Sequence, residues 1–198
     1  MKSWVRSAAS GAGAMARAIE PLRKRVAHFA TRRLKLSDAQ MTHAVARIPD
    51  VSAVTISTHH AGLRVDASFR DGGALLVHLV PESVAFAPRG AKEWSLRCEP
   101  ERAVYDPRCA DIVAALATEV ARKLWGPFLR GRALPSGRGA IAHRDGTVLV
   151  VDLRSVPAVR SALTQPLMAA AIEAFGLRSI EAEDGGLVLV PGVPGFEL

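Results

Sequence analysis

Three Asp-Gly pairs constrain the fold of this chain more than any other feature of its sequence. They occur at residues 71–72, 145–146 and 184–185, and each stands before a run of apolar residues. Asp-Gly is a preferred centre of tight hairpin turns, because both positions accept the positive φ angles that such turns require. The pairs therefore predict antiparallel hairpins in both halves of the chain.

Alternation of apolar and polar residues predicts further strands of the same meander. Most of the segments alternate along their length, as strands with one covered face do. Pro81 is expected to end its strand, since proline has no N–H to donate to a ladder. The expected strands cover residues 51–58, 62–69, 74–80, 83–88, 93–99, 140–144, 147–153, 178–183 and 186–190.

Helix signals stand between and after these strands. Asp106 and Pro107 are suited to be the cap and first residue of the clearest helix, which Gly126 and Pro127 end. The apolar stripe of this helix consists of Cys109, Ile112, Val113, Leu116, Val120 and Leu124. Shorter helices are expected at residues 38–47, 156–163 and 166–175.

Together these signals predict an α+β fold, in which an antiparallel meander sheet packs around or against a long helix. A single domain is expected to span residues 38–191. An arm of residues 1–37 precedes it, and a loose tail of residues 192–198 follows.

A faint internal repeat relates residues 62–125 to residues 140–175. It rests on the sequence RDGGALLVHL at 70–79, which is echoed by RDGTVLVVDL at 144–153. Any Asp-Gly hairpin that leads into a buried strand gives a similar echo, so duplication has a simpler alternative.

The positive charge of the chain is concentrated at its N-terminal end. The net charge is +7 over 198 residues. Residues 1–35 contain nine Lys or Arg and a single acid, Glu20, so this segment carries +8 and the rest −1. A nearly neutral domain does not suit a basic face for nucleic acid, and the charge favours a basic tether.

The arm is also amphipathic, with helical pieces expected at 14–20 and 21–34. Such a helix suits an anionic membrane surface, where apolar side chains enter the interface and each nearby charge adds about 1 kcal/mol. Packing of the apolar stripe on a protein partner, on the chain's own domain or on a second copy is the alternative. The residues predicted to bind membrane are Lys2, Trp4, Arg6, Met15, Arg17, Ile19, Leu22, Arg23, Lys24, Arg25, Val26 and Phe29.

The sequence contains no recognisable catalytic constellation, metal site or cofactor motif, and we expect none. Cys98 and Cys109 fit no ligand spacing. A strand would point His59 and His60 to opposite faces, which favours a polar strand end over a metal site. His78 and Asp152 have side chains suited to acid–base chemistry, but no nucleophile motif accompanies them.

Residues 175–189, FGLRSIEAEDGGLVL, resemble the closing hairpin of bacterial phospholipid-binding proteins of the TULIP type. The strand VVDL at 150–153 and the short helices after it are similar as well. The resemblance implies a curved antiparallel sheet wrapped around a helix, an apolar groove for acyl chains and no catalytic residues. The residues expected to line such a groove are Leu63, Val65, Leu76, Trp94, Leu96, Ile112, Leu116, Val120, Val148 and Val150.

The arm and the resemblance predict a peripheral membrane-surface protein that binds a phospholipid or fatty acyl ligand, and we expect no nucleic acid. No apolar run approaches the roughly 18 residues of a spanning helix and no secretory signal is convincing, so we expect a cytoplasmic location. One alternative is a scaffold that docks on a protein through the arm. Another is salt-sensitive nucleic-acid binding by the arm alone. A third is an enzyme with His78 and Asp152 in one pocket.

Overall fold

The computed structural model describes residues 32–86, 90–126, 129, 141–174 and 176–192. The twelve arm residues predicted to bind membrane lie outside these ranges, as does most of the predicted tail. The strands are β1 (Leu34–Ser37), β2 (Val51–His59), β3 (Gly62–Phe69), β4 (Ala74–Phe86), β5 (Lys92–Glu99), β6 (Ile141–Asp145), β7 (Val148–Asp152), β8 (Leu177–Glu183) and β9 (Gly186–Pro191). The helices are α2 (Asp38–Val45), α3 (Pro107–Trp125), α4 (Pro157–Leu163) and α5 (Pro166–Glu173), with 3₁₀ turns at Glu101–Tyr105 and Leu153–Ser155.

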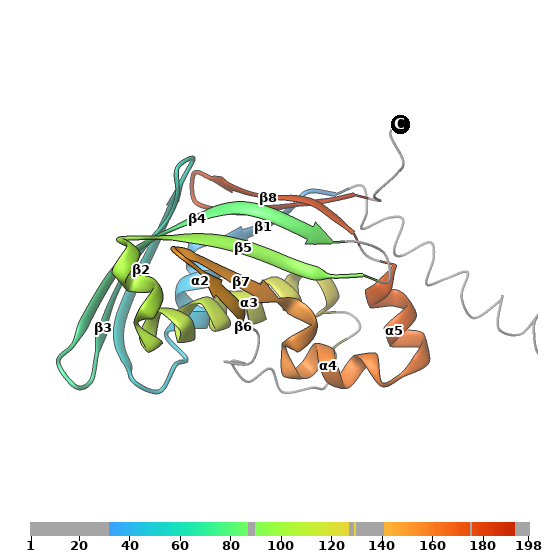
Figure 1. Ribbon diagram of the computed structural model, residues 1–198, viewed down its shortest axis with the longest axis horizontal. Coiled ribbons are helices and arrows are strands. Elements are labelled where there is room, and N and C mark those ends of the chain that lie inside the picture. Colours follow the sequence, from blue (N-terminus) through green and yellow to red (C-terminus); the bar gives the residue numbers. More distant parts are fainter. Residues whose placement is uncertain (1–31, 87–89, 127–128, 130–140, 175, 193–198) are drawn as a thin grey trace, which may run out of the picture.

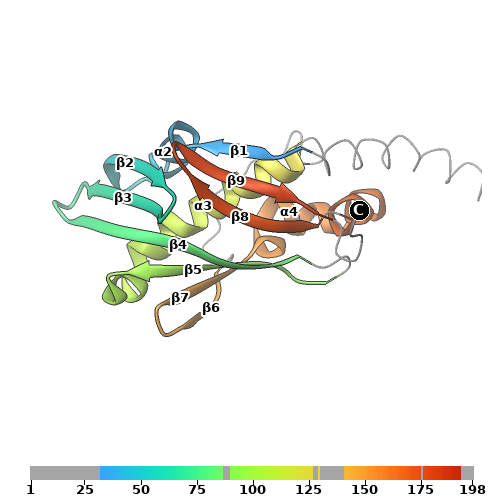
Figure 2. The same ribbon diagram turned by 90° about the horizontal axis from the view of Figure 1, so that it is seen from above.

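The fold is α+β, with two antiparallel sheets. Six strands form one sheet in the order β2-β3-β4-β5-β7-β6, and three form the other in the order β1-β9-β8. The larger sheet arches over α3, and β8 of the smaller sheet runs beside β4 (Figures 1 and 2). The two segments of the sequence echo, in β4 and β7, lie on either side of β5. The predicted meander around a long helix is confirmed.

Helix α3 is enclosed by the rest of the domain. The Asp106 side chain accepts a hydrogen bond from the Arg108 amide at 2.8 Å, so the predicted cap is confirmed. Every residue from 112 to 121 is buried, whereas a helix covered on one face alone would bury only a stripe. Many of these residues are alanines, whose small side chains let strands approach the helix closely on several sides.

Strand β4 is longer than predicted, because it continues through Pro81. The sequence predicted an end at Pro81 and a separate edge strand at 83–88, but one strand runs to Phe86. The pairing of β4 with β5 shifts between Pro81 and Ser83, which marks a bulge. A bulge takes up the residue that cannot donate to the ladder, so the strand bends there instead of ending.

The boundary between arm and domain lies earlier than the predicted residue 37. Residues Leu34–Ser37 form β1, which pairs with β9, and Leu36 is fully buried. Leu34 is therefore not part of the helix predicted over 21–34, and residues 21–31 lie outside the described ranges. The amphipathic pattern of the arm did not distinguish a helix from this short strand, because only the distant β9 provides its partner.

The register of β4 decides which of its apolar residues belong to the core. Leu75, Val77 and Leu79 face inward and are at most 8% exposed, whereas Leu76 between them is 53% exposed. Strand periodicity alone left this choice open, since β4 is apolar on both faces over this segment.

Replacing Leu116 or Leu76 by alanine tests this assignment with the same chemical change at two positions. Leu116→Ala should lower the free energy of unfolding by about 2–5 kcal/mol, because the side chain is fully buried on α3. Leu76→Ala should change it by no more than about 0.5 kcal/mol. Urea denaturation followed by circular dichroism measures both, and equal losses would contradict the register.

Candidate functional site

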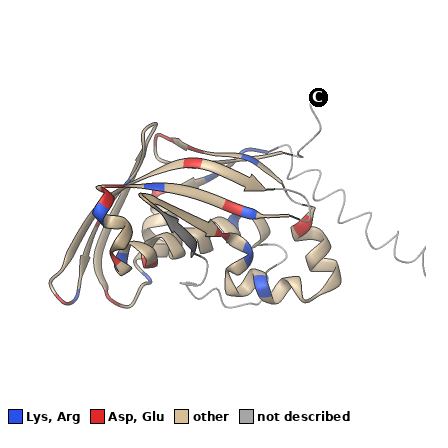
Figure 3. Ribbon diagram, viewed as in Figure 1, with Lys and Arg blue, Asp and Glu red and all other residues tan. Residues whose placement is uncertain are grey.

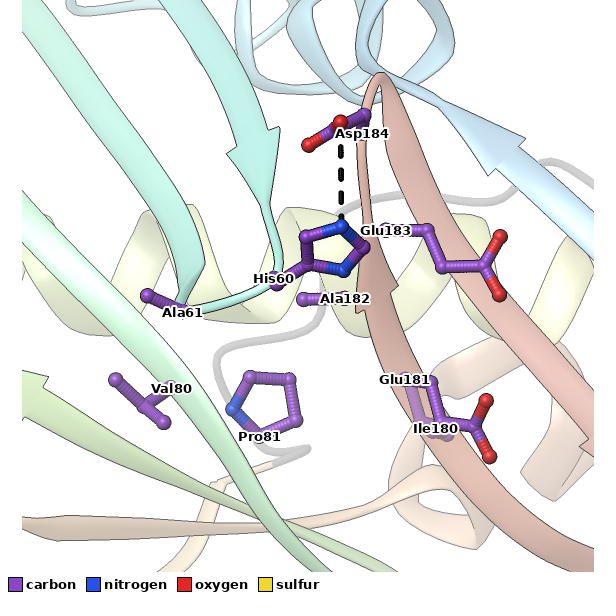
Figure 4. Close-up of a pocket in the computed structure, with 9 residues that line it drawn as sticks. All are labelled: His60, Ala61, Val80, Pro81, Ile180, Glu181, Ala182, Glu183 and Asp184. Atoms are coloured by element: carbon purple, nitrogen blue, oxygen red, sulfur yellow. Dashed lines mark ion pairs between the residues drawn. The ribbon is translucent and has the colours of Figure 1, made fainter.

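A cavity lies where β4 and β8 run side by side without a hydrogen-bonded ladder. We call this line of contact, between residues 80–86 of β4 and the strand β8, the seam. At one end it opens into a hollow of about 610 Å³, which we call the seam hollow (Figure 4). The lining residues are His60, Ala61, Val80, Pro81, Ile180, Glu181, Ala182, Glu183 and Asp184.

The seam exists because β3 is too short to accompany β4 along its whole length. The β3–β4 ladder ends at the pair Leu63 and Leu79, and β4 continues for seven further residues. Strand β8 takes the place beside them, but among the described strands it forms a ladder only with β9. Pro81 has no backbone N–H to donate, so this part of β4 is a weak partner for a new ladder.

A hydrogen-bond cluster around Asp38 fixes the mouth of the seam hollow. The Asp38 carboxylate accepts bonds from the Thr58 amide at 3.1 Å and the Thr58 hydroxyl at 2.5 Å. The Asp38 amide donates to the Gly185 carbonyl at 3.2 Å, and the Gly185 amide donates to the Thr58 carbonyl at 3.1 Å. Helix α2, strand β2 and the β8–β9 turn are therefore held together at one point.

The lining of the seam hollow is partly apolar and partly polar, with acidic residues at its rim. Val80, Pro81 and Ile180 contribute the apolar walls. Arg33 bridges two rim acids, with its guanidinium 2.9 Å from Glu181 and 2.7 Å from Glu183. These ion pairs are exposed and contribute little to stability, so the arginine mainly lowers the negative charge of the rim.

His59 and His60 both lie beside Asp184 at the rim. The His59 ring nitrogen is 3.4 Å from the carboxylate, and the His60 ring nitrogen is 4.0 Å away (Figure 4 shows the latter pair). The part of the chain that the structure describes contains no group of three or more His, Cys, Asp or Glu side chains placed to hold a metal. The two histidines thus form part of a polar turn.

Seven of the ten predicted groove residues pack in the core around α3. They are Leu63, Val65, Trp94, Leu96, Ile112, Leu116 and Val120, and each is fully buried.

The assignment of Leu76, Val148 and Val150 to a groove around α3 is wrong. Val150 is paired with Ser95 and Val148 with Arg97, and these partners lie on the outer face of the sheet. The inward positions of β7 belong to Leu149 and Val151, which are fully buried. The error arises because β7, like β4, is apolar on both faces.

His78 and Asp152 do not share a pocket. His78 lies across from Glu99 at one end of β5, whereas Asp152 lies across from Glu93 at the other, roughly 20 Å away. The hydrogen bond from His78, together with nearby Arg97, lowers the pKa of the Glu99 carboxyl. Asp152 instead accepts from the Arg154 amide at 2.9 Å and the Ser155 hydroxyl at 3.0 Å. An acid–base pair of these two residues is excluded.

The two cysteines are both buried, and they are not joined by a disulfide. No helix among the described residues is long and apolar enough to cross a membrane.

Comparison of the chain with protein-family models, with curated proteins and with solved structures gives no match. The similarity of residues 175–189 to TULIP-type proteins therefore stays a prediction. Function has to be argued from the seam and its surroundings.

The sequence did not single out the residues that form the seam. The sequence predicted that a strand ends at Pro81. That Pro81 lies at an unpaired strand edge depends on β8, which follows about 100 residues later in the sequence. Ile180 and Glu181 were assigned to a hairpin, and nothing in a hairpin pattern indicates which strand lies beside its outer edge.

Replacing Asp38 by alanine should loosen the mouth of the seam hollow. The change leaves the amide and hydroxyl of Thr58 without their acceptor, and Thr58 is only 1% exposed. We expect a loss of about 1–3 kcal/mol in the free energy of unfolding, measured by urea denaturation. The exposed Asp50, replaced in the same way, is the control and should cost less than about 0.5 kcal/mol. Equal effects of the two substitutions would contradict the role given to Asp38.

Proposed function

We propose that this protein is a peripheral lipid-binding protein, which takes an acyl chain at the seam and attaches to anionic membranes through its basic arm. The observation that carries the proposal is the seam hollow. Its volume of about 610 Å³ lies within the range of small-molecule sites, which is about 300–1,000 Å³.

The surroundings of the seam hollow favour an apolar ligand. Ile180 is 5% exposed, so its side chain faces the core beneath the seam. An acyl chain placed between the strands needs no hydrogen-bond partners and gains from burial of apolar surface, about 25 cal/mol for each Å².

The charge distribution supports attachment through the arm and not through the domain. Lys and Arg are interspersed with Asp and Glu over the described elements (Figure 3). Residues 1–31 contain six Lys or Arg and one acid. The arm joins the domain at Arg32 and Arg33, next to β1 and the rim of the seam hollow, so an arm bound to a membrane would hold the rim near the lipid.

Mass spectrometry of an organic extract from natively purified protein tests the ligand directly. We expect a phospholipid or fatty acid in an amount close to that of the protein. The same protein after denaturation, organic extraction and refolding is the control and should yield none. An extract without lipid, together with no lipid uptake by the refolded protein, would overturn the proposal.

Deleting residues 1–31 tests the attachment, and it leaves β1 and its buried Leu36 in place. If half of the six basic side chains act at the surface, at about 1 kcal/mol each, affinity for anionic vesicles should fall roughly 100-fold. Sedimentation with phosphatidylglycerol vesicles measures the change, with phosphatidylcholine vesicles as the control. Unchanged binding of the shortened chain would show that the arm does not attach the protein.

A further inference from the structure

The basic arm joins the domain directly at the rim of the seam hollow. Arg33, just before β1, contacts both Glu181 and Glu183 through its guanidinium. Lys35 on β1 donates a hydrogen bond to the Asp184 carbonyl at 2.8 Å. The run of basic residues thus continues from the arm into β1, where its last members already lie against the acidic rim.

The rim carboxylates remain open to further basic side chains. Glu181, Glu183 and Asp184 have side chains that are 47%, 37% and 75% exposed. A carboxylate has two oxygens and accepts several hydrogen bonds at once, so the contacts with Arg33 leave acceptor capacity. The hollow of about 610 Å³ opens beside these acids, with apolar side chains in part of its lining.

The end of the arm has a sequence pattern that complements this surface. At about 100° per residue, Leu22, Val26 and Phe29 form one apolar line on the helix that the sequence predicts. Arg23 and Arg25 lie roughly 70–90° to either side of this line. An apolar line flanked by two arginines suits a hollow whose lining is partly apolar and whose rim is acidic.

The length of the arm is sufficient to cover the rim. Leu34 of β1 and Ile180 of β8 both pair with Leu189 of β9. From Ile180 to Asp184 the strand β8 advances four residues, which is roughly 13 Å. A helix rises about 1.5 Å per residue, so about nine residues cover this distance. Residues 22–31 are therefore long enough to fold back from the start of β1 along the whole rim.

Docking within one chain needs little intrinsic affinity. A segment tethered next to its site meets that site at an effective concentration on the order of millimolar. Exposed ion pairs are individually weak, but apolar side chains that enter the hollow at the same time add the burial of apolar surface. The arm of a second copy has to reach the same rim from bulk solution, so the chain's own arm is the favoured occupant.

We propose that residues 22–31 fold back over the seam hollow and cover it when no membrane is present. Arg23 and Arg25 contact the rim acids, and the apolar side chains between them enter the hollow. An anionic membrane competes with the rim for the same basic side chains, so attachment of the arm to lipid uncovers the hollow. This regulation rests on the proposed lipid-binding function, whereas the docking itself requires no lipid.

Hydrogen exchange of the full-length chain without lipid, followed by mass spectrometry, tests the docking. The rim variant carries Glu181→Gln, Glu183→Gln and Asp184→Asn, and asparagine keeps the turn before Gly185 favourable. Amides of residues 22–31 should exchange about 10-fold more slowly in wild type than in the rim variant, because docking protects them. The protection should not change when the protein is diluted 10-fold.

A distant variant with Asp50→Asn, Asp66→Asn and Glu101→Gln is the matched control. These three acids are exposed and lie outside the lining of the hollow, and their replacement changes the net charge by the same amount. The distant variant should keep the slow exchange of wild type. Equal exchange in wild type and the rim variant would overturn the docking and leave lipid binding intact. Protection that disappears on dilution would also overturn it, because the arm would then dock on a second copy.

Sedimentation with phosphatidylglycerol vesicles tests the regulation. The rim variant should bind about 10-fold more tightly than the distant variant, because its arm is free to bind lipid. In chains that lack residues 1–31, the two sets of substitutions should have equal effects. Equal affinity of the two full-length variants would overturn the regulation. Slow exchange of the arm in a wild-type chain that binds neither vesicles nor lipid would overturn the lipid-binding function and leave the docking intact.

Discussion

The enclosure of α3 by the sheet is the constraint on which the rest of the structure depends. A helix that is buried over residues 112–121 on every side needs strands around it and not merely beside it. The larger sheet meets this need by arching from β2 to β6, and β1, β8 and β9 cover the remaining side. The alanines of α3 allow these strands to come close enough for the core to be filled.

Wrapping the helix with two sheets leaves one line along which the strands do not pair. An unpaired strand edge leaves backbone donors and acceptors without ladder partners, and proteins usually protect such edges. Here β4 and β8 cover each other's unpaired edges. Pro81 has no backbone N–H, so the edge of β4 has one donor fewer to satisfy. The seam hollow lies on this same line, where the two sheets meet without pairing.

The two ends of the seam differ in chemistry. The hollow has apolar walls and an acidic rim, which disfavours a negative head group there. The other end contains the buried Lys92, whose ammonium group lies 6.0 Å from the centre of the Phe86 ring and is acted on by the Glu173 carboxylate.

The sequence by itself determined the local elements, namely the turns at Asp71 and Asp184, the cap of α3 at Asp106 and the alternation of β3 and β5. Each of these signals involves only a few neighbouring residues, so it can be identified from the sequence without knowledge of the fold. Only the tertiary structure decided the faces of β4 and β7, the pairing of β1 with β9 and the seam. It also brought together Phe86, Lys92, Trp125 and Glu173, which belong to four different elements. When a strand is apolar on both faces, its sequence does not indicate which face lies in the core. Contacts between residues that are distant in the sequence form only when the chain wraps around α3.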